Sequence, residues 1–295
     1  MSSLQAVDIE ERDSEQMPNY PWYFQHRQSL SSQSQSTAQF YLYDDFVIGD
    51  TWMATQPVGS FPGNWTCPNG TVVTIAPTGT QNGIVQVPAG SFLNGNFIAT
   101  IASNLFPVTF ANIAKIVFRS VFRMTSAATG GESVVGFTSS GSNALDAASH
   151  LYGAFINFCP NWGQVLSDWD TRATIPAASM TGFTYGIYNG SYPANFGYKL
   201  STLVTSLSVS TWYDTVISMI PGVSCTFYVA PYGQTPAFDA KCTVVAQIPS
   251  SASYGSIPVL GCNATYPGVL QVDKVEYGIW LTEGNKQLGA GLINF

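Results

Sequence analysis

The chain has 295 residues, of which only 27 are charged, with 10 Lys and Arg against 17 Asp and Glu. Charged residues thus make up 9%, against roughly 25% in an average soluble protein, while the apolar share of 45% is ordinary. Ten cations and a pI near 4.6 exclude a basic nucleic-acid-binding surface. No apolar run approaches the ~20 residues of a membrane-spanning helix.

Residues 1–38 have the composition of an arm or linker, not of a domain. Five acidic residues fall within the first 15 positions, and a Ser- and Gln-rich run closes the segment. Between them lies an aromatic cluster, formed by Tyr20, Trp22, Tyr23 and Phe24. No basic and apolar leader precedes the cluster, so no signal peptide is expected. We expect the aromatic cluster to dock the chain onto a partner protein.

Residues 39–295 read as one all-β domain. Residues 115–124 alternate between an apolar face and a face with Arg119 and Arg123, which predicts a half-buried strand. Turn sequences such as Pro221-Gly222 separate many short runs of this kind. A dozen short strands predict a two-sheet sandwich or jelly roll. The expected strands are 71–76, 83–87, 96–101, 115–124, 133–138, 151–158, 184–188, 212–220, 225–230, 241–248 and 270–281.

The supply of catalytic side chains is small. The two histidines, His26 and His150, allow no His-rich metal site, and no metal or other cofactor is expected. Asp168 and Asp170 share one face beside Trp169, although a solvated turn flanking Trp169 explains them better. Asp273 and Glu276 lie three positions apart, so in a regular strand they point to opposite faces. We therefore expect no enzyme, and no catalytic residue is assigned.

The five cysteines are widely spaced and are expected to be buried free thiols, with a Cys225–Cys242 bridge between neighbouring strands as the alternative.

An aromatic stretch between positions 160 and 199 is the best binding feature of the sequence. Aromatic rings beside Asp and Asn suit a sugar-binding face, because rings stack on sugar C–H groups and polar groups bind hydroxyls. The same composition also fits a protein interface or strand-facing core, and these alternatives stay open. The candidate ligand- or interface-binding residues are Trp162, Asp168, Trp169, Asp170, Tyr188 and Tyr192.

Two segments of the domain resemble one family. Residues 211–218, led by Trp212, precede residues 222–229 in a pattern similar to the paired strands of concanavalin A-like lectin/glucanase (laminin G-like) domains. Residues 43–46 resemble the first strand of that family, and residues 270–279 resemble its last strand, which pairs back near the first. The resemblance implies a two-sheet antiparallel jelly-roll β-sandwich. The strand motif of the glucanases, Glu-x-Asp-x-x-Glu, is absent.

The family also contains bacteriophage virion proteins, and the acidic arm and low charge look similar to those. The expected function is thus a non-enzymatic structural protein of the virion, such as a capsid decoration, fibre or tail component. It would assemble in the host cytoplasm as a homo-oligomer, bound to other virion proteins through the N-terminal arm, with no nucleic-acid or membrane partner. The alternative is a lectin-like module that binds a host surface glycan.

Overall fold

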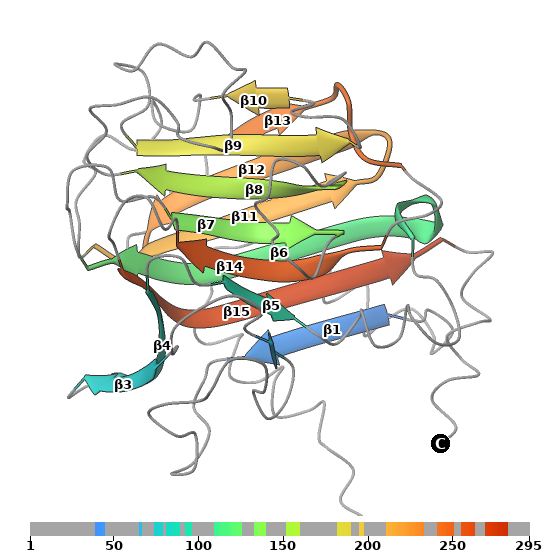
Figure 1. Cartoon of the computed structure of the whole chain (residues 1–295). Coiled ribbons are helices and arrows are strands. Elements are labelled where there is room, and N and C mark those ends of the chain that lie inside the picture. Colours follow the sequence, from blue (N-terminus) through green and yellow to red (C-terminus); the bar gives the residue numbers. More distant parts are fainter. Residues whose placement is uncertain are drawn as a thin grey trace, which may run out of the picture.

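A computed structural model describes residues 39–44, 65–66, 74–78, 81–88, 92–95, 109–125, 133–139, 152–159, 182–189, 195–197, 211–232, 241–250, 255–262 and 269–282. These residues form fifteen strands and one 3₁₀ turn, η1 (Phe110–Asn112), arranged in two antiparallel sheets (Figure 1). In this part of the chain no helix has the length and apolar character that a membrane span needs. The arm 1–38 lies outside the described residues.

The first sheet, here called sheet A, has eight strands. Its order is β13-β12-β11-β6-β15-β4-β3, and β1 pairs with the second half of β15 beside β4. The strands are β1 (Gln39–Asp44), β3 (Thr74–Thr78), β4 (Gln81–Pro88), β6 (Ile113–Met124), β11 (Tyr213–Ile220), β12 (Ser224–Pro231), β13 (Lys241–Val244) and β15 (Val269–Leu281). The central strands β6 and β15 are the longest, at 12 and 13 residues, and they place side chains from distant segments on a common surface.

The second sheet, sheet B, has seven strands in the order β10-β9-β8-β7-β14-β5-β2. The strands are β2 (Trp65–Thr66), β5 (Phe92–Gly95), β7 (Ser133–Thr138), β8 (Tyr152–Cys159), β9 (Gly182–Asn189), β10 (Asn195–Gly197) and β14 (Ile257–Cys262). In Figure 1 the strands of both sheets cross the view in roughly the same direction, as expected for an aligned sandwich.

Aromatic rings from the two sheets meet in the core. Phe183 of sheet B packs edge-on against Phe122 and Tyr213 of sheet A, with ring centroids 6.3 and 4.9 Å apart. Tyr185 stacks on Phe227 at 4.8 Å. Even-numbered residues of β6 therefore point toward sheet B, and its odd-numbered residues point to the opposite, outer side of sheet A.

The predicted strand pattern is confirmed over most of the described chain, and β11 and β12 form the expected hairpin. Its turn contains Gly222, whose φ of +72° favours glycine. The closing strand β15 also pairs with β1 as the resemblance implied. The predicted strand 96–101 lies outside the described residues.

Several strand predictions were wrong, and the short strands β2, β5 and β10 were not predicted. The strand predicted over 241–248 ends at Val244, and Gln247 then adopts a φ of +57°, which a strand does not allow. The strand β14 was missed because Pro258 reads as a strand breaker. In the fold, β5 pairs only with Val259–Gly261, so Pro258 breaks no bond on that side of β14.

The free-thiol interpretation is confirmed for the three cysteines that the structure describes, Cys225, Cys242 and Cys262. Cys225 lies opposite Val244 and Cys242 lies opposite Phe227, so the two cysteines are offset, and the alternative of a bridge is wrong. Burial raises the pKa of the Cys225 thiol well above its ordinary value.

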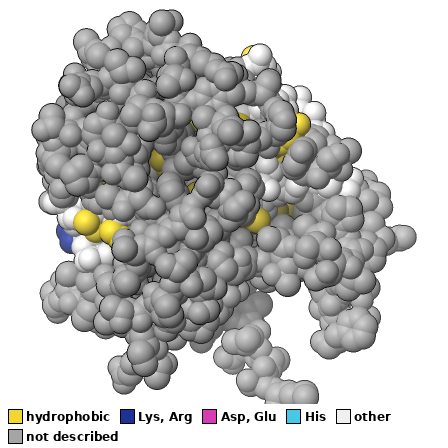
Figure 2. All heavy atoms as spheres, viewed as in Figure 1, with side chains coloured by type: hydrophobic (Ala, Val, Ile, Leu, Met, Phe, Trp, Pro, Cys, Tyr) yellow, Lys and Arg dark blue, Asp and Glu magenta, His cyan; other side chains and the backbone are white. Residues whose placement is uncertain are grey.

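Strand β6 is not half-buried as its alternation suggested. Its outward-pointing residues Val117, Arg119 and Val121 are only 4%, 2% and 1% exposed. Among the coloured side chains at the surface in Figure 2, apolar groups are visible in several places and basic atoms at the left edge. The domain has few charged residues, and several of them are buried on the outer face of sheet A: Arg119, Asp214, Lys274 and Glu276.

Candidate binding face on the outer side of sheet A

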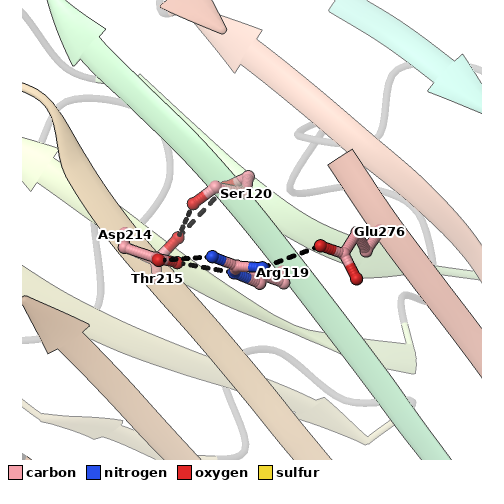
Figure 3. Close-up of polar contacts among 5 residues, drawn as sticks. All are labelled: Arg119, Ser120, Asp214, Thr215 and Glu276. Carbon is pink, nitrogen blue, oxygen red and sulfur yellow. Dashed lines mark hydrogen bonds and ion pairs between the residues drawn. The ribbon is translucent and has the colours of Figure 1, made fainter. Parts of the chain in front are cut away.

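A buried ionic cluster lies on the outer face of sheet A, where β11, β6 and β15 run side by side (Figure 3). Arg119 donates two hydrogen bonds to Asp214, from Nε to Oδ1 at 2.9 Å and from a terminal nitrogen to Oδ2 at 2.7 Å. Its other terminal nitrogen donates to Oε1 of Glu276 at 2.7 Å. All three residues are 2% exposed. One guanidinium thus joins three strands.

The inner face of the same strands carries a hydroxyl pair. Oγ of Ser120 lies 3.0 Å from Oγ1 of Thr215, which also donates to the backbone oxygen of Ser120 at 3.1 Å. Both side chains are fully buried. Polar contacts therefore join β6 to β11 on both faces of sheet A, which fixes the register of the two strands.

A second group of outward-pointing residues lies at one end of the same strands and of β12. This group, called here the aromatic row, consists of Tyr232, Trp212, Arg123 and Gln271. Trp212 directly precedes β11, and the guanidinium carbon of Arg123 on β6 is 4.6 Å from the centroid of its indole ring. Tyr232 lies on the other side of Trp212 and donates its N–H to the Trp212 carbonyl at 2.8 Å. Gln271 of β15 lies opposite Arg123 and accepts a bond from its Nε at 2.7 Å.

The aromatic row is open to ligands, whereas the ionic cluster is not. Tyr232 is 43% exposed, and Trp212 and Arg123 are half-buried. The row crosses four neighbouring elements, so with strands ~4.8 Å apart it extends over roughly 14 Å. It presents aromatic rings and a guanidinium on one surface, which are groups that hold a small polar ligand, while Gln271 is only 5% exposed.

The charges of the ionic cluster affect the pKa of the Tyr232 phenol in the aromatic row. Burial raises the pKa of Tyr232, and the carboxylates of Asp273 and Asp214 raise it further, against the opposing charge of Arg119. The hydroxyl therefore stays protonated at neutral pH and can donate a hydrogen bond.

The simple alternation expected for β15 is interrupted near Asp273. The pairing of β15 with β6 shifts between Val272 and Lys274, which marks a β-bulge at Asp273. A bulge interrupts the two-residue period. The sequence-based argument that Asp273 and Glu276 face opposite sides assumed a regular strand, and the bulge removes that assumption.

Sequence reasoning did not select the residues of this face. Tyr188 is the one candidate ligand residue among those the structure describes, and it is 2% exposed, with its ring 5.5 Å from that of Phe155 in the core. The other candidates, Trp162, Asp168, Trp169, Asp170 and Tyr192, lie outside the described residues, as do Tyr20, Trp22, Tyr23 and Phe24. The sequence does contain a signal for this face. Arg119 and Glu276 are charged residues within apolar strands of a chain that has few charges.

The two stacked sheets, the closing strand and the order of the strands define the concanavalin A-like lectin/glucanase fold. Three solved structures are similar to the chain over most of its length. A protein of unknown function from Shewanella oneidensis MR-1 has a TM-score of 0.50 and 15% identity, covering 88% of this chain and 95% of its own.

Two legume lectins are similar in the same way. Peanut lectin, solved with a nine-residue peptide, has a TM-score of 0.50 and 11% identity over 83% of this chain and 98% of its own. A seed lectin of Lotus tetragonolobus has a TM-score of 0.51 and 10% identity over 82% and 99%. At these identities the likeness establishes the fold alone. No protein-family model matches the sequence, and no curated protein is similar enough to count as a match.

Proposed function

We propose that the protein is a lectin-like module that binds a glycan on the aromatic row of sheet A. The observation that carries the proposal is the row itself: Tyr232, Trp212 and Arg123 lie side by side and partly exposed on one face, and the buried Gln271 holds Arg123 from the next strand. An aromatic ring gives a flat surface for the C–H face of a sugar, and a guanidinium group binds its hydroxyls.

The ionic cluster argues against a hydrolase. General acid–base catalysis needs carboxyl groups that reach the substrate. Asp214 and Glu276 are both 2% exposed, and both are bonded to Arg119. We therefore assign them a structural role beneath the binding face.

The virion role stays a prediction. It depends on the arm 1–38 and its aromatic cluster, which lie outside the described residues. Deletion of residues 1–38, followed by an assay of incorporation into particles, would test it without affecting the proposal for the sandwich.

A glycan array probed with the full chain tests the proposed function. We expect binding by the wild type and roughly tenfold weaker binding by Tyr232→Ala, which removes the most exposed ring of the row. Tyr228→Ala is the matched control. Tyr228 lies on β12 and on the same face, but ~14 Å along the strand from Tyr232, and its removal is expected to leave binding unchanged.

Two results would contradict the proposal. The first is no binding to any glycan at high protein concentration. The second is normal binding by Tyr232→Ala together with loss of binding in Trp162→Ala and Trp169→Ala, which would place the glycan on the stretch 160–199 instead.

A further inference from the structure

The side chain of Arg123 is held in a fixed orientation by two contacts. Its Nε donates to Oε1 of Gln271 at 2.7 Å, and its guanidinium lies over the indole of Trp212 at 4.6 Å. The first contact fixes one edge of the guanidinium, and the second fixes the plane against an aromatic face. The group is therefore oriented before any ligand arrives.

The two terminal nitrogens of Arg123 remain available. A guanidinium has five N–H donors, and the bond to Gln271 uses only the one on Nε. No other hydrogen bond or ion pair of Arg123 involves a residue within the described part of the chain, and the side chain is only half-buried. Arg119 differs in every respect, because two carboxylates occupy its Nε and both terminal nitrogens.

A pair of terminal nitrogens in this geometry matches the two oxygens of a carboxylate. No carboxylate in the described part of the chain is bonded to Arg123, since Asp214 and Glu276 are bonded to Arg119 and no ion pair joins Asp273 to Arg123. A large polyanion is disfavoured by the net charge of −7 on the chain. A small ligand with one carboxylate is not, because charges beyond ~8 Å are largely screened at physiological salt.

We infer that the aromatic row recognises an acidic saccharide, whose carboxylate pairs with the terminal nitrogens of Arg123 while its ring lies against Tyr232. Trp212 then serves as the platform of Arg123, and Gln271 as the residue that orients it. The inference rests on the proposed function and specifies the class of sugar.

The test compares two sugars that differ only in the acid group. The full chain is titrated with methyl β-D-glucuronide and with methyl β-D-glucoside, in competition with whichever array glycan it binds. We expect the acid to compete at least tenfold better than the neutral sugar, in line with a charge-assisted hydrogen bond. Arg123→Gln should abolish this preference. Lys115→Gln should keep it, because it removes one positive charge from the same strand and the same face.

Each outcome bears on one claim. Equal competition by the two sugars overturns the inference, as does a preference that survives in Arg123→Gln. Array binding limited to neutral glycans leaves the proposed function standing and removes the acidic ligand. Competition by acetate as strong as that by the glucuronide means that an anion, not a sugar, is bound, and also overturns the inference. Weakening of the acid preference between 50 and 500 mM salt supports it.

Discussion

Arg119 and Arg123 lie four residues apart on β6 and point to the same face of sheet A, yet their surroundings are opposite. Arg119 is 2% exposed and bonded to two carboxylates from two neighbouring strands. Arg123 is half-buried, rests on Trp212 and holds a single bond to an amide. The first arginine satisfies its charge inside the protein, and the second keeps part of its hydrogen-bonding capacity for a ligand.

The comparison explains why a chain with so few charges places them within strands. A buried charge is tolerated only where partners surround it. Arg119 meets that condition through residues 95 and 157 positions away. Conformational specificity, more than raw stability, is the benefit expected from such a cluster, because only one register of β11, β6 and β15 brings the three groups together.

The largest expected effect is that of Arg119→Met. The variant leaves two buried carboxylates without their cation, so we expect the free energy of unfolding to fall by about 3–5 kcal/mol. Denaturant unfolding measures it. Arg123→Met is the control and should lose only about 1 kcal/mol, since it gives up one hydrogen bond and one ring contact at a half-open site.

The triple variant Arg119→Met, Asp214→Leu and Glu276→Leu sharpens the same comparison. It removes all three charged groups and fills their space with apolar side chains, so most of the loss in Arg119→Met should be recovered. Equal destabilisation by Arg119→Met and Arg123→Met, or no recovery in the triple variant, would contradict the roles assigned to the two arginines.

A smaller effect is expected on the inner face. Thr215→Val removes the hydroxyl that bonds to Ser120, so we expect a loss of roughly 1–2 kcal/mol in denaturant unfolding. Adding Ser120→Ala should recover part of the loss, because it removes the hydroxyl left without its partner. If Thr215→Val lowered the free energy of unfolding as much as Arg119→Met, the hydroxyl pair would stabilise the pairing of β6 with β11 as strongly as the ionic cluster, which would contradict the ranking.

The smallest effect concerns Lys115, the third basic residue of β6 and of the same face. Burial lowers the pKa of Lys115 to about 8 from the ordinary 10.5. Between these values the unfolded chain binds more protons than the folded one, so the free energy of unfolding rises with pH. We expect the half-buried charge of Lys115 to lower the free energy of unfolding at neutral pH by only about 1 kcal/mol, because solvent contact reduces the effect.

Lys115→Met isolates that contribution. Its stability advantage over the wild type should be largest below pH 8 and should shrink as the pH approaches 10.5, where the wild-type lysine is neutral in both states. Urea unfolding of both proteins at a series of pH values measures the difference. A difference that stays constant across this range would show that Lys115 keeps its ordinary pKa.

Local patterns predicted the elements of the sandwich well. The alternation of residues 115–124 predicted β6 and placed Arg119 and Arg123 on one face. The predicted strand 133–138 matches the bounds of β7. Failures came where the local signal was misleading: Pro258 hid β14, and the apolar residues after Val244 extended β13 too far. The bulge at Asp273 also could not be read from alternation, because a bulge depends on how two strands pair.

The sequence alone determined the all-β class and the two faces of the strands, because these follow from a two-residue period and from turn residues, and the family resemblance implied the pairing of the first and last strands. Only the tertiary structure determined which charged side chains form ion pairs with one another. Arg119 and Arg123 carry the same local signature, and their different roles arise from the neighbouring strands: carboxylates from β11 and β15 lie beside the one, and an indole and an amide lie beside the other. Strand order and register set those neighbours, and both depend on contacts between residues far apart in the chain.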